Sequence, residues 1–356
     1  MAQVTAIVAV EAQRSLNSTD LPSLDKVETH VDSSSPARLL GSQLRPIITA
    51  FFDDIGYKTP PRVQSDALWE AMLLKAREGG YPLDTAHSQQ CFRTGYSYAA
   101  VCFPDHPLEA QVYTGLHTWL GTQIDDVVLK EDVEKFPQRF FAGQDQANPV
   151  LQGYADVLRS TFEIWDTVPA NFIILSSVAF INCNVLEERA EFQSMMPTGG
   201  GRRWPHYFRD REGVPEAYSY FTFPKAKYPE MSKFLEAIPD MGRFLNLAND
   251  VISFYKEELA GVKKNYIHQR ANYEGRDVTE VLKSAAKECV EAAKRVEVVL
   301  EGREPYRQAW LSHLHGYIHM HRITERYRLD EIGLAEERTC VVPSLTQETL
   351  EALERA

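Results

Sequence analysis

Hydrophobic residues recur along most of the chain at the three- and four-residue spacing of amphipathic helices. Leu68, Met72 and Ala76 follow this spacing in a segment that stops at Gly79. Longer helical patterns cover residues 107–128, 150–190, 231–259, 277–301 and 305–330, with proline or glycine between them. Strand alternation and hairpin dipeptides are almost absent. The pattern predicts a single all-α domain, in which helices pack as an antiparallel array around a core that could hold a ligand.

The N-terminal region lacks this helical pattern. Residues 1–42 are rich in Ser, Thr and Asp, which predicts a tail that is disordered or becomes ordered late. We expect the helical domain over residues 43–335 and a C-terminal extension over residues 336–356. Inside the domain, residues 194–230 contain a run of three glycines and five prolines. A loop of this length in a compact domain is usually functional.

Composition and charge narrow the class of protein. The chain has 356 residues, with 38 basic and 50 acidic side chains and a net charge of −12, which disfavours nucleic acid as a partner. Apolar runs such as residues 172–181 are broken before the roughly 20 residues that a membrane-spanning helix needs. We therefore expect a soluble protein with no membrane span and no nucleic-acid partner.

The cysteines and the N-terminus indicate the compartment. Five scattered cysteines without a CxxC pair favour neither a disulfide framework nor a zinc ribbon, and they fit a reducing compartment. The short apolar stretch at residues 4–10 has no basic residue before it and Glu11 directly after it, which makes a poor signal peptide. We predict a cytoplasmic protein.

The segment NDVISFYKE, residues 249–257, carries three oxygen-bearing side chains at helical spacing. Asn249, Ser253 and Glu257 stand at positions i, i+4 and i+8, so at about 100° per residue they project to one side of a helix. An amide carbonyl, a hydroxyl and a carboxylate are hard oxygen donors of the kind that bind Mg²⁺. Lys256 returns to nearly the same side, where a cation suits a ligand with several negative charges, such as a diphosphate.

A solvated polar helix face is the alternative interpretation of this segment. Phe244, Leu247 and Val251 are among the apolar residues that surround it, so the helix is expected to be buried over much of its circumference. Buried polar groups need partners. The segment itself leaves the metal site and the solvated face as two open interpretations.

Asp125 and Asp126 close the apolar helical segment at residues 113–124. Two acids at the negative end of a helix dipole are locally unfavourable, and a bound cation would offset that cost. An acidic helix end open to water is the alternative for an isolated pair of this kind. Together with residues 249–257, the pair predicts a second wall that binds Mg²⁺.

Basic residues near the end of the last helical pattern and in the long loop are candidates for phosphate binding. Arg326 could hold a phosphate by two parallel hydrogen bonds, and Tyr327 could donate a third. The long loop adds a basic cluster, made of Arg202, Arg203, Arg209 and Arg211. That cluster could equally be a surface loop that offsets the charge of an acidic protein.

Two other motifs are weaker signals. His315 and His319 form an i, i+4 pair that could ligate zinc, but neither an HExxH motif nor a cysteine pair accompanies them, which favours ordinary core or surface histidines. The sequence GGGRR at residues 199–203 lacks the terminal GK[ST] and the strand-to-helix setting of a P-loop. We expect it to be a loop.

In combination, these motifs resemble those of class I terpene cyclases, and most closely the fungal trichodiene synthase group of sesquiterpene cyclases. NDVISFYKE is preceded by the Asp125–Asp126 pair and followed by the Arg326–Tyr327 pair. Corresponding segments in the same order are FRTGYSYA near Arg93, HYFRDREG around Arg209, VKKNY at residues 262–266, and HGY and ERYRLDEI within residues 315–332. The resemblance spans about residues 90–332. It implies a class I terpenoid synthase bundle of α-helices that encloses an apolar cavity.

The resemblance also implies roles for individual residues. Its Mg²⁺ ligands are Asp125, Asn249, Ser253 and Glu257, and its diphosphate-binding groups are Arg209, Lys256, Arg326 and Tyr327. Arg93 is a further substrate-binding candidate, although its spacing to Asp125 requires a gap. The family pattern DDxx[DE] is here DDVVL, with Leu129 at the position of the last acid. This departure leaves the role of Asp126 open.

The implied reaction is ionisation of farnesyl diphosphate with about three Mg²⁺ ions, followed by cyclisation of the allylic cation and release of diphosphate. The product would be a polycyclic sesquiterpene hydrocarbon or alcohol, of the trichodiene or longiborneol type. Trp119, Phe180 and Tyr317 are candidate aromatic residues of the cavity wall. Core packing is the alternative for Trp119 and Phe180, whereas the HGY motif favours Tyr317 as cavity wall.

Other functions and substrates stay open at the level of sequence. A prenyl chain-elongating synthase shares the fold and the Mg²⁺ chemistry but uses two aspartate-rich motifs, whereas the second motif here is NDxxSxxxE. A non-catalytic helical protein that binds an isoprenoid would require no metal. Geranyl and geranylgeranyl diphosphate are alternative substrates, because chain length depends on cavity depth. The resemblance also implies a homodimer.

Overall fold

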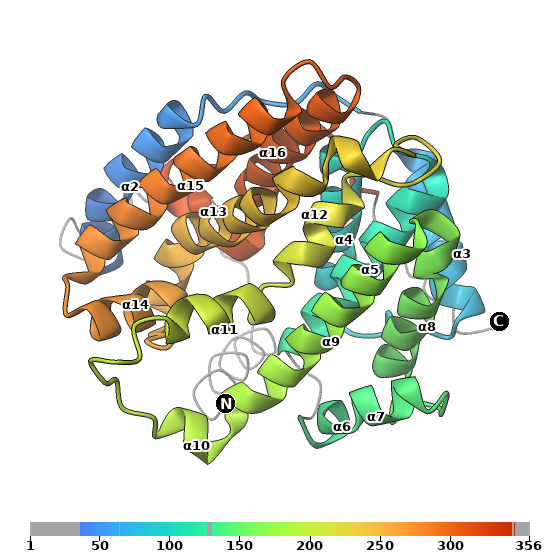
Figure 1. Ribbon diagram of the computed structural model, residues 1–356, viewed down its shortest axis with the longest axis horizontal. Coiled ribbons are helices and arrows are strands. Elements are labelled where there is room, and N and C mark those ends of the chain that lie inside the picture. Colours follow the sequence, from blue (N-terminus) through green and yellow to red (C-terminus); the bar gives the residue numbers. More distant parts are fainter. Residues whose placement is uncertain (1–35, 64, 127–129, 344, 346–356) are drawn as a thin grey trace, which may run out of the picture.

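The computed structural model describes residues 36–63, 65–126, 130–343 and 345, which form a bundle of helices (Figure 1). The α-helices are α2 (Pro36–Asp54), α3 (Asp66–Glu78), α4 (Ala86–Cys102), α5 (Leu108–Asp126), α6 (Lys130–Glu134), α7 (Phe136–Phe141), α8 (Pro149–Ile164), α9 (Thr167–Glu188), α10 (Ala190–Gln193), α11 (Trp204–Glu212), α12 (Pro215–Phe221), α13 (Ile238–Leu259), α14 (Tyr266–Glu274), α15 (Val278–Leu300) and α16 (Tyr306–Ile323). The same residues contain four 3₁₀ turns, η1 (Met231–Lys233), η2 (Leu235–Ala237), η3 (Glu325–Tyr327) and η4 (Leu329–Ile332). Within the described ranges, β-type pairing is limited to one isolated parallel bridge between Val63 and Cys340. The prediction of an all-α fold is confirmed.

Side chains at the start of several helices accept hydrogen bonds from the first turn. Thr85 caps α4 through the backbone N–H of Ser88 at 3.0 Å, and Asn148 caps α8 through that of Leu151 at 3.0 Å. Asp277 caps α15 in the same way. These caps satisfy backbone N–H groups that have no partner inside the helix, which explains where the helices begin.

Several predicted segments are divided differently in the structure. Residues 150–190 form two helices, α8 and α9, and the long loop expected over residues 194–230 contains α11 and α12. Pro205 and Pro215 lie in the first turns of those two helices, where proline is tolerated because its missing N–H would be unpaired anyway. The last long helix ends at Ile323, so Arg326 and Tyr327 lie on the 3₁₀ turn η3 and not in the helix.

The domain boundaries also differ from those predicted. Helix α2 begins at Pro36, so residues 36–42 belong to the folded body, while residues 1–35 of the predicted tail lie outside the described residues. Past the predicted boundary at 335, Glu336 accepts hydrogen bonds from Tyr57 at 2.5 Å and from Thr59 at 3.0 Å, and Cys340 is buried. This boundary therefore does not mark the end of the packed chain. Residues 344 and 346–356 lie outside the described residues.

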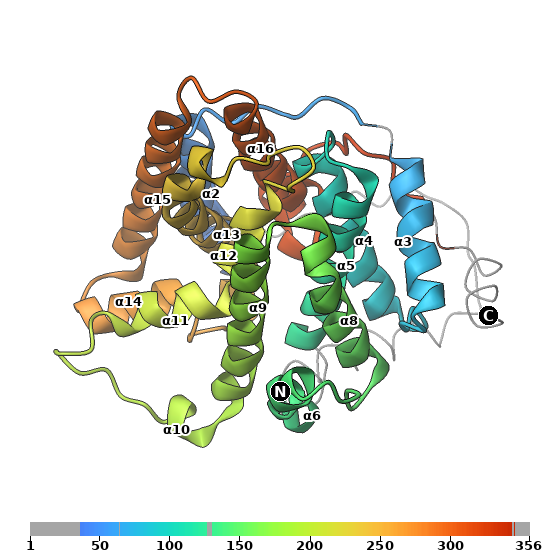
Figure 2. The ribbon, with the colours of Figure 1, turned by 45° about the vertical axis from the view of Figure 1, so that its right-hand side comes forward.

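Two glycines let the helices around the core come into backbone contact. A Cβ atom on Gly95 of α4 would lie 2.3 Å from the carbonyl oxygen of Gly115 on α5, and one on Gly316 of α16 would lie 2.3 Å from that of Val101 on α4. No real Cβ atom fits at such distances. The FRTGYSYA and HGY segments therefore fix α4 against both neighbours, and Figure 2 shows α4 and α5 side by side.

Helix α9 is long and apolar enough to cross a membrane by length and composition, but 61% of its most apolar window is buried inside the protein. Figure 1 shows it running diagonally beside α12. Its Ser177 lies 2.9 Å from Nε2 of His117 on α5, which ties the helix to the centre of the bundle. This is the burial expected of a core helix.

Candidate active site

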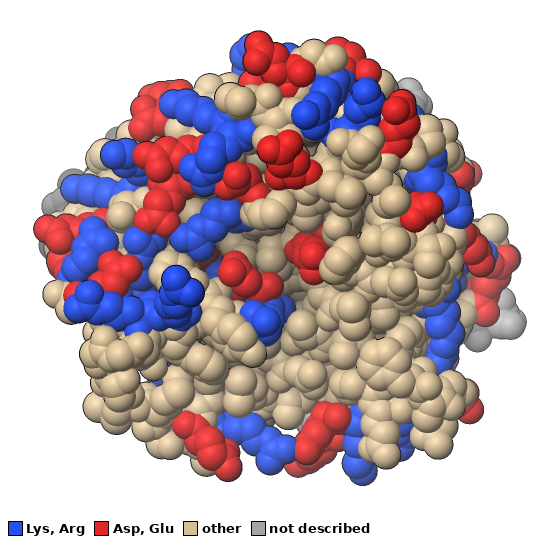
Figure 3. Space-filling model, in the orientation of Figure 1, with Lys and Arg blue, Asp and Glu red and all other residues tan. Residues whose placement is uncertain are grey.

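Two connected cavities lie between the helices that carry the predicted site residues. Charged groups line the outer cavity, and aromatic and small polar side chains line the inner one. Asp125, Arg209, Glu212, Asn249 and Arg326 line both, so one cavity opens into the other. Figure 3 shows a hollow near the centre of one face, with acidic and basic side chains around it.

Helix α13 forms one wall of the outer cavity. Asn249 and Glu257 line it, and Ser253, which is buried, donates a hydrogen bond to Oε1 of Glu257 at 2.5 Å. The side-chain amide of Asn265 donates to the other oxygen of Glu257 at 2.9 Å. Ser253 and Glu257 therefore meet as their i, i+4 spacing predicts. Their role as metal ligands stays a prediction.

The end of α5 forms the facing wall. Asp125 lines both cavities, while both oxygens of Asp126 accept hydrogen bonds from the guanidinium of Arg326, at 2.7 and 2.9 Å. Burial favours the protonated acid, but His87 and Arg326 hold the pKa of Asp126 well below its usual range. In the structure, Asp126 therefore anchors the side chain of Arg326. Leu129, the departure from the family pattern, lies outside the described residues.

Arg209 is the buried hub that connects α11 to α13. Its Nε donates to Asp250 at 2.8 Å, and its two terminal nitrogens donate to Glu212 at 2.9 Å and to Oδ1 of Asn249 at 3.1 Å. Burial would lower the pKa of Arg209, but Asp250 and Glu212 raise it well above its usual range. Arg209 therefore stays charged beside the predicted metal ligand Asn249.

The outer cavity carries more negative than positive side chains. Its described carboxylates are Asp125, Asp126, Glu187, Glu212, Asp250 and Glu257, and its described cations are Arg209, Lys256, Lys264 and Arg326. Burial raises the pKa of Asp250 to about 7 although Arg209 opposes it, and Glu257 and Glu212 add to the rise. Carboxylates crowded in this way are stabilised by a cation, and oxygen donors are those that Mg²⁺ prefers. The donor set therefore fits Mg²⁺.

His321 fixes the orientation of the Asn249 amide. Nδ1 of His321 lies 2.8 Å from the carbonyl oxygen of Tyr317, so this nitrogen carries the proton, and Nε2 accepts a hydrogen bond from Nδ2 of Asn249 at 3.1 Å. Burial lowers the pKa of His321 to about 3, which keeps the ring neutral. The amide oxygen of Asn249 is thereby turned toward Arg209.

Of the other predicted diphosphate groups, Lys256 lines the outer cavity, Tyr327 lines the inner one, and Arg326 lines both. The ammonium of Lys256 lies 5.4 Å above the ring of Tyr327, and burial, with Arg326 nearby, lowers the pKa of Lys256. Burial raises the pKa of Tyr327 to about 12, so its hydroxyl keeps its proton and can donate. Arg209, like Arg326, lines both cavities. The structure brings together all four predicted diphosphate groups.

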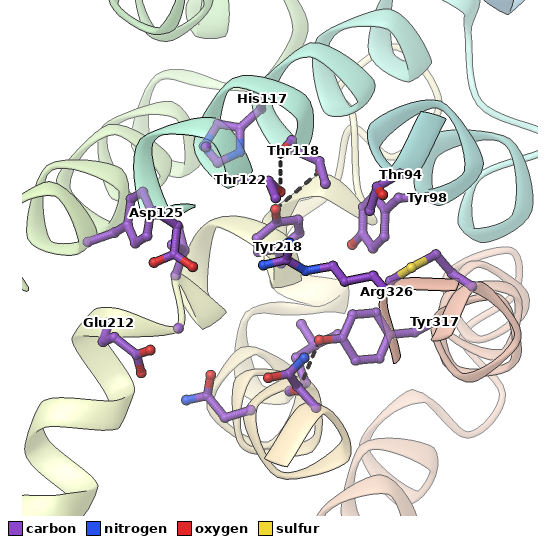
Figure 4. Close-up of a pocket in the computed structure, with 18 of the residues that line it drawn as sticks. Thr94, Tyr98, His117, Thr118, Thr122, Asp125, Glu212, Tyr218, Tyr317 and Arg326 are labelled. Atoms are coloured by element: carbon purple, nitrogen blue, oxygen red, sulfur yellow. Dashed lines mark hydrogen bonds between the residues drawn. The ribbon is translucent and has the colours of Figure 1, made fainter. Parts of the chain in front are cut away.

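Seven ring-bearing residues line the inner cavity, namely Tyr98, His117, Tyr154, Phe180, Tyr218, Tyr317 and Tyr327. Phe180 and Tyr317 therefore lie where the sequence placed them. Figure 4 shows Asp125 and Glu212 facing each other across the cavity, with Arg326 reaching between Tyr218 and Tyr317.

Three predicted residues, Ser253, Trp119 and Arg93, line neither cavity, and buried Ser253 touches the outer one only through its hydrogen bond to Glu257. Trp119 is fully buried, its indole N–H donates to the carbonyl oxygen of Ser88 at 3.1 Å, and its ring packs edge-on against Phe92. Trp119 is thus a core residue, and its predicted place in the cavity wall is wrong. Arg93 lines neither cavity, although its neighbour Thr94 does. Its predicted contact with substrate has no support in the structure.

Several lining residues were not identified from the sequence. Thr118 and Thr122 lie on the same face of α5 as Asp125, at i−7 and i−3, and this spacing is the signal that could have found them. Glu212 and Gly213 belong to the HYFRDREG segment, in which the sequence pointed only to Arg209 and Arg211. A Cβ atom at Gly213 would lie 2.1 Å from Oδ1 of Asn246 and 2.4 Å from a terminal nitrogen of Arg209, so a larger residue would displace these side chains.

The histidines set aside as zinc candidates have other partners. His319 lies 2.9 Å from Glu336 through Nδ1 and 2.9 Å from Thr339 through Nε2. His315 lies 3.4 Å from the backbone nitrogen of Lys58. Each belongs to a separate contact, which agrees with their interpretation as ordinary structural histidines.

Comparison with known proteins places this geometry in a family. The model of the trichodiene synthase family matches residues 83–339. A longiborneol synthase of Gibberella zeae is 39% identical over 332 residues, which cover 91% of this chain and 96% of that protein. Terpene synthase BipA of Cochliobolus sativus is 36% identical over 302 residues, which cover 83% of this chain and 93% of the relative. A cucumene synthase variant of known structure matches with a TM-score of 0.52 and 14% identity over 77% of this chain and all of that chain, which supports the fold. The chain therefore belongs to the trichodiene synthase family of terpene synthases.

Proposed function

We propose that the protein is a Mg²⁺-dependent sesquiterpene cyclase, which ionises farnesyl diphosphate and cyclises the resulting allylic cation. The main support is that a charged outer cavity opens into an inner cavity lined by aromatic rings, with Asp125, Asn249 and Arg326 at their junction. A prenyl diphosphate has these same two parts, a multiply charged head and an apolar chain. The longiborneol synthase among the relatives supports the same reaction class.

Asp125, Asn249, Ser253 and Glu257 would hold the Mg²⁺ ions, of which we expect about three. Bound Mg²⁺ supplies positive charge that stabilises the departing diphosphate. The excess of carboxylates over basic groups in the outer cavity supports this assignment. Because of this excess, the basic side chains alone would not offset the charge of a bound diphosphate, and metal ions would supply the remaining positive charge.

Arg209, Lys256, Arg326 and Tyr327 would bind the diphosphate by charge-assisted hydrogen bonds. Arg326 presents a planar pair of donors that suits phosphate, and its ion pair with Asp126 positions it at the junction of the cavities. Lys256 is buried enough for its pKa to be lowered, so a negative ligand beside it would strengthen its charge. These contacts would hold the leaving group where the two cavities meet.

The inner cavity would shape and protect the cation. Ring faces stabilise positive charge, and a wall with little access to water prevents early capture of the cation. Burial raises the pKa of Tyr98 and of Tyr317 well above the usual range, so both remain neutral phenols and not reactive phenolates. The product is then a polycyclic hydrocarbon, or an alcohol if one water is admitted. A cytoplasmic location and a homodimer stay predictions from the sequence.

The decisive experiment is incubation of the purified full chain with farnesyl diphosphate, with Mg²⁺ or with EDTA, followed by gas chromatography and mass spectrometry of a hexane extract. We expect a cyclic C15 product that depends on Mg²⁺. Glu257→Gln should abolish it. Glu258→Gln is the matched control, because Glu258 is the next residue but pairs with Lys263 at 2.7 Å and lines neither cavity.

Other outcomes separate the alternatives. Elongated diphosphates formed from farnesyl and isopentenyl diphosphate would indicate a chain-elongating synthase. No turnover of C10, C15 or C20 diphosphates would contradict the proposal and favour a binding protein. Turnover that survives Glu257→Gln would show that the metal ligands are assigned wrongly.

A further inference from the structure

A cluster of His, Cys and Asp side chains includes Asp126 of the outer cavity and two residues, His87 and Cys91, that line neither cavity. His87 and Cys91 stand at positions i and i+4 of α4, and Asp126 is the last residue of α5. Nε2 of His87 lies 3.3 Å from Sγ of Cys91 and 3.3 Å from Oδ2 of Asp126. All three potential ligand atoms lie within 4.8 Å of one another.

These distances suit a small tetrahedral metal ion. Tetrahedral zinc bonds of about 2.0 Å to nitrogen or oxygen and about 2.3 Å to sulfur place a nitrogen about 3.3 Å from an oxygen ligand and about 3.5 Å from a sulfur ligand. The two distances from Nε2 of His87 agree with these values to within about 0.2 Å, and Sγ of Cys91 lies within 4.8 Å of Oδ2 of Asp126. The backbone contact of α4 with α5 at Gly95 holds the two helices in this register.

The donor set discriminates between metals. A thiolate and an imidazole suit Zn²⁺ and related ions, whereas Mg²⁺ prefers oxygen donors alone. We propose that His87, Cys91 and Asp126 form a binding site for a thiophilic divalent cation such as Zn²⁺, separate from the predicted Mg²⁺ ligands of α13.

Local charge favours a cation at this position. Both oxygens of Asp126 accept hydrogen bonds from the Arg326 guanidinium, at 2.7 and 2.9 Å, as a carboxylate does. Burial, and next the charge of Asp126, raises the pKa of the Cys91 thiol to about 12. A metal ion must therefore displace the proton of the Cys91 thiol. The negative charge of Asp126, which makes this proton harder to remove, also attracts a divalent ion.

Occupation of the site would act on the diphosphate-binding group next to it. Oδ2 of Asp126, the proposed ligand atom, also accepts the 2.7 Å hydrogen bond from Arg326. A divalent cation on this oxygen competes for that hydrogen bond and repels the guanidinium. We expect Zn²⁺ to weaken the hold on Arg326 and to inhibit turnover. The inhibition rests on the proposed terpene cyclase function, whereas the metal binding does not.

The first test is spectroscopic and needs no turnover. The metal-free full chain is titrated with Co²⁺, which replaces Zn²⁺, in the absence of Mg²⁺ and diphosphate. We expect a near-ultraviolet charge-transfer band from thiolate to Co²⁺ that saturates at one ion per chain. Cys91→Ser and His87→Gln should each remove it, and Cys183→Ser is the matched control because Cys183 is another buried cysteine, on α9.

Two results would overturn the site: no charge-transfer band in the unaltered protein, or a band that persists in Cys91→Ser. His87→Gln changes a side chain that is 34% exposed, so it tests the site even if Cys91→Ser does not fold. Thermal melting of each variant checks that it is folded.

The second test concerns the coupling to Arg326. With farnesyl diphosphate and saturating Mg²⁺, Zn²⁺ should lower turnover of the unaltered protein about tenfold, the effect of losing one hydrogen bond between charged groups. The same Zn²⁺ concentration should leave Cys91→Ser nearly unaffected. Equal inhibition of both proteins would overturn the coupling, because zinc would then act at the Mg²⁺ ligands. If the protein shows the Co²⁺ band but no turnover, the metal site is supported and only the proposed function is contradicted.

Discussion

The buried ring of His321 accepts a hydrogen bond from Asn249 and so determines which end of that amide faces Arg209. The His321 proton is committed to the carbonyl oxygen of Tyr317 at 2.8 Å, so Nε2 offers only a lone pair, 3.1 Å from Nδ2 of Asn249. The side-chain oxygen of Asn249 then accepts from Arg209 at 3.1 Å. A histidine that lies outside every motif thus orders a predicted metal ligand.

His321→Leu should therefore raise the Mg²⁺ concentration needed for half-maximal turnover. Without its partner, the Asn249 amide is free to rotate, and a buried donor left unpaired costs about 1–3 kcal/mol. Mg²⁺ titration of turnover measures the effect. His315→Leu, on the same helix but beside Lys58, should leave the Mg²⁺ requirement unchanged. An unchanged requirement in His321→Leu would contradict the positioning role.

Asp126→Asn should lower turnover about tenfold, the effect expected from losing one hydrogen bond between charged groups. The variant removes the charge that anchors Arg326 but leaves Asp125 in place, so the Mg²⁺ requirement should change little. Asp240→Asn is the control, because Asp240 forms a comparable ion pair with Arg295 on the surface, at 2.6 Å. Steady-state kinetics of the two variants will separate the anchoring of Arg326 from a general effect of removing an ion pair.

Phe180→Leu should change the ratio of products, and Trp119→Phe should not. Phe180 lines the inner cavity, whereas Trp119 packs in the core and donates to Ser88. The tryptophan variant should instead lower the melting temperature, because it removes volume and a hydrogen bond from the core. Gas chromatography of the products and thermal melting test both statements. An altered product ratio in Trp119→Phe would show that Trp119 does contribute to the cavity wall.

Gly316→Ala should destabilise the protein by about 1–3 kcal/mol or more, because the added methyl group would meet the backbone of Val101 at 2.3 Å. Backbone cannot rotate away as a side chain can. Gly199→Ala is the control, since a Cβ atom there has open space around it. Denaturant unfolding of both variants measures the difference, and equal stability would show that α16 does not contact α4 so closely.

The free energy of unfolding should fall as the pH drops below about 6.5. Burial, with a contribution from His106, lowers the pKa of His313 from 6.5 to about 3, so between these values the unfolded chain binds the proton and the folded one does not. The contribution of such a histidine to the free energy of unfolding is therefore fully present above pH 6.5 and is lost as the pH falls toward 3. At pH 5 the loss for one histidine is about 2 kcal/mol. His313→Gln should show a smaller difference between pH 7 and pH 5 in urea unfolding. An equal difference would exclude His313 as a source of the pH dependence.

Local spacing explains what the sequence could predict about the site. Asn249, Ser253 and Glu257 lie on one helix, so their common face follows from helix geometry alone. The ion pair of Asp126 with Arg326 joins residues 200 positions apart, and its geometry depends on how η3 leaves α16. The spacing of residues along a helix cannot predict such a contact between distant segments.

The error over Trp119 has a similar physical origin. Aromatic residues close to a metal motif fit a cavity wall and a core equally well, and only the rotation of α5 decides between them. Thr118, one residue earlier, faces the inner cavity, while Trp119 turns toward Phe92 on α4. The division of residues 194–230 was missed because prolines at helix starts were interpreted as loop signals.

The backbone contacts at Gly95 and Gly316 have a consequence for the engineering of product range. Because α4 touches α5 and α16 without intervening side chains, the framework around the inner cavity cannot be widened there by small substitutions. Variation in cavity shape is then confined to exchangeable lining residues, such as Thr94, Thr118 and Thr122. The backbones of the three helices therefore fix the outline of the cavity, and the lining side chains determine its detailed shape. Variant libraries aimed at new terpene skeletons should change the threonines and keep the glycines.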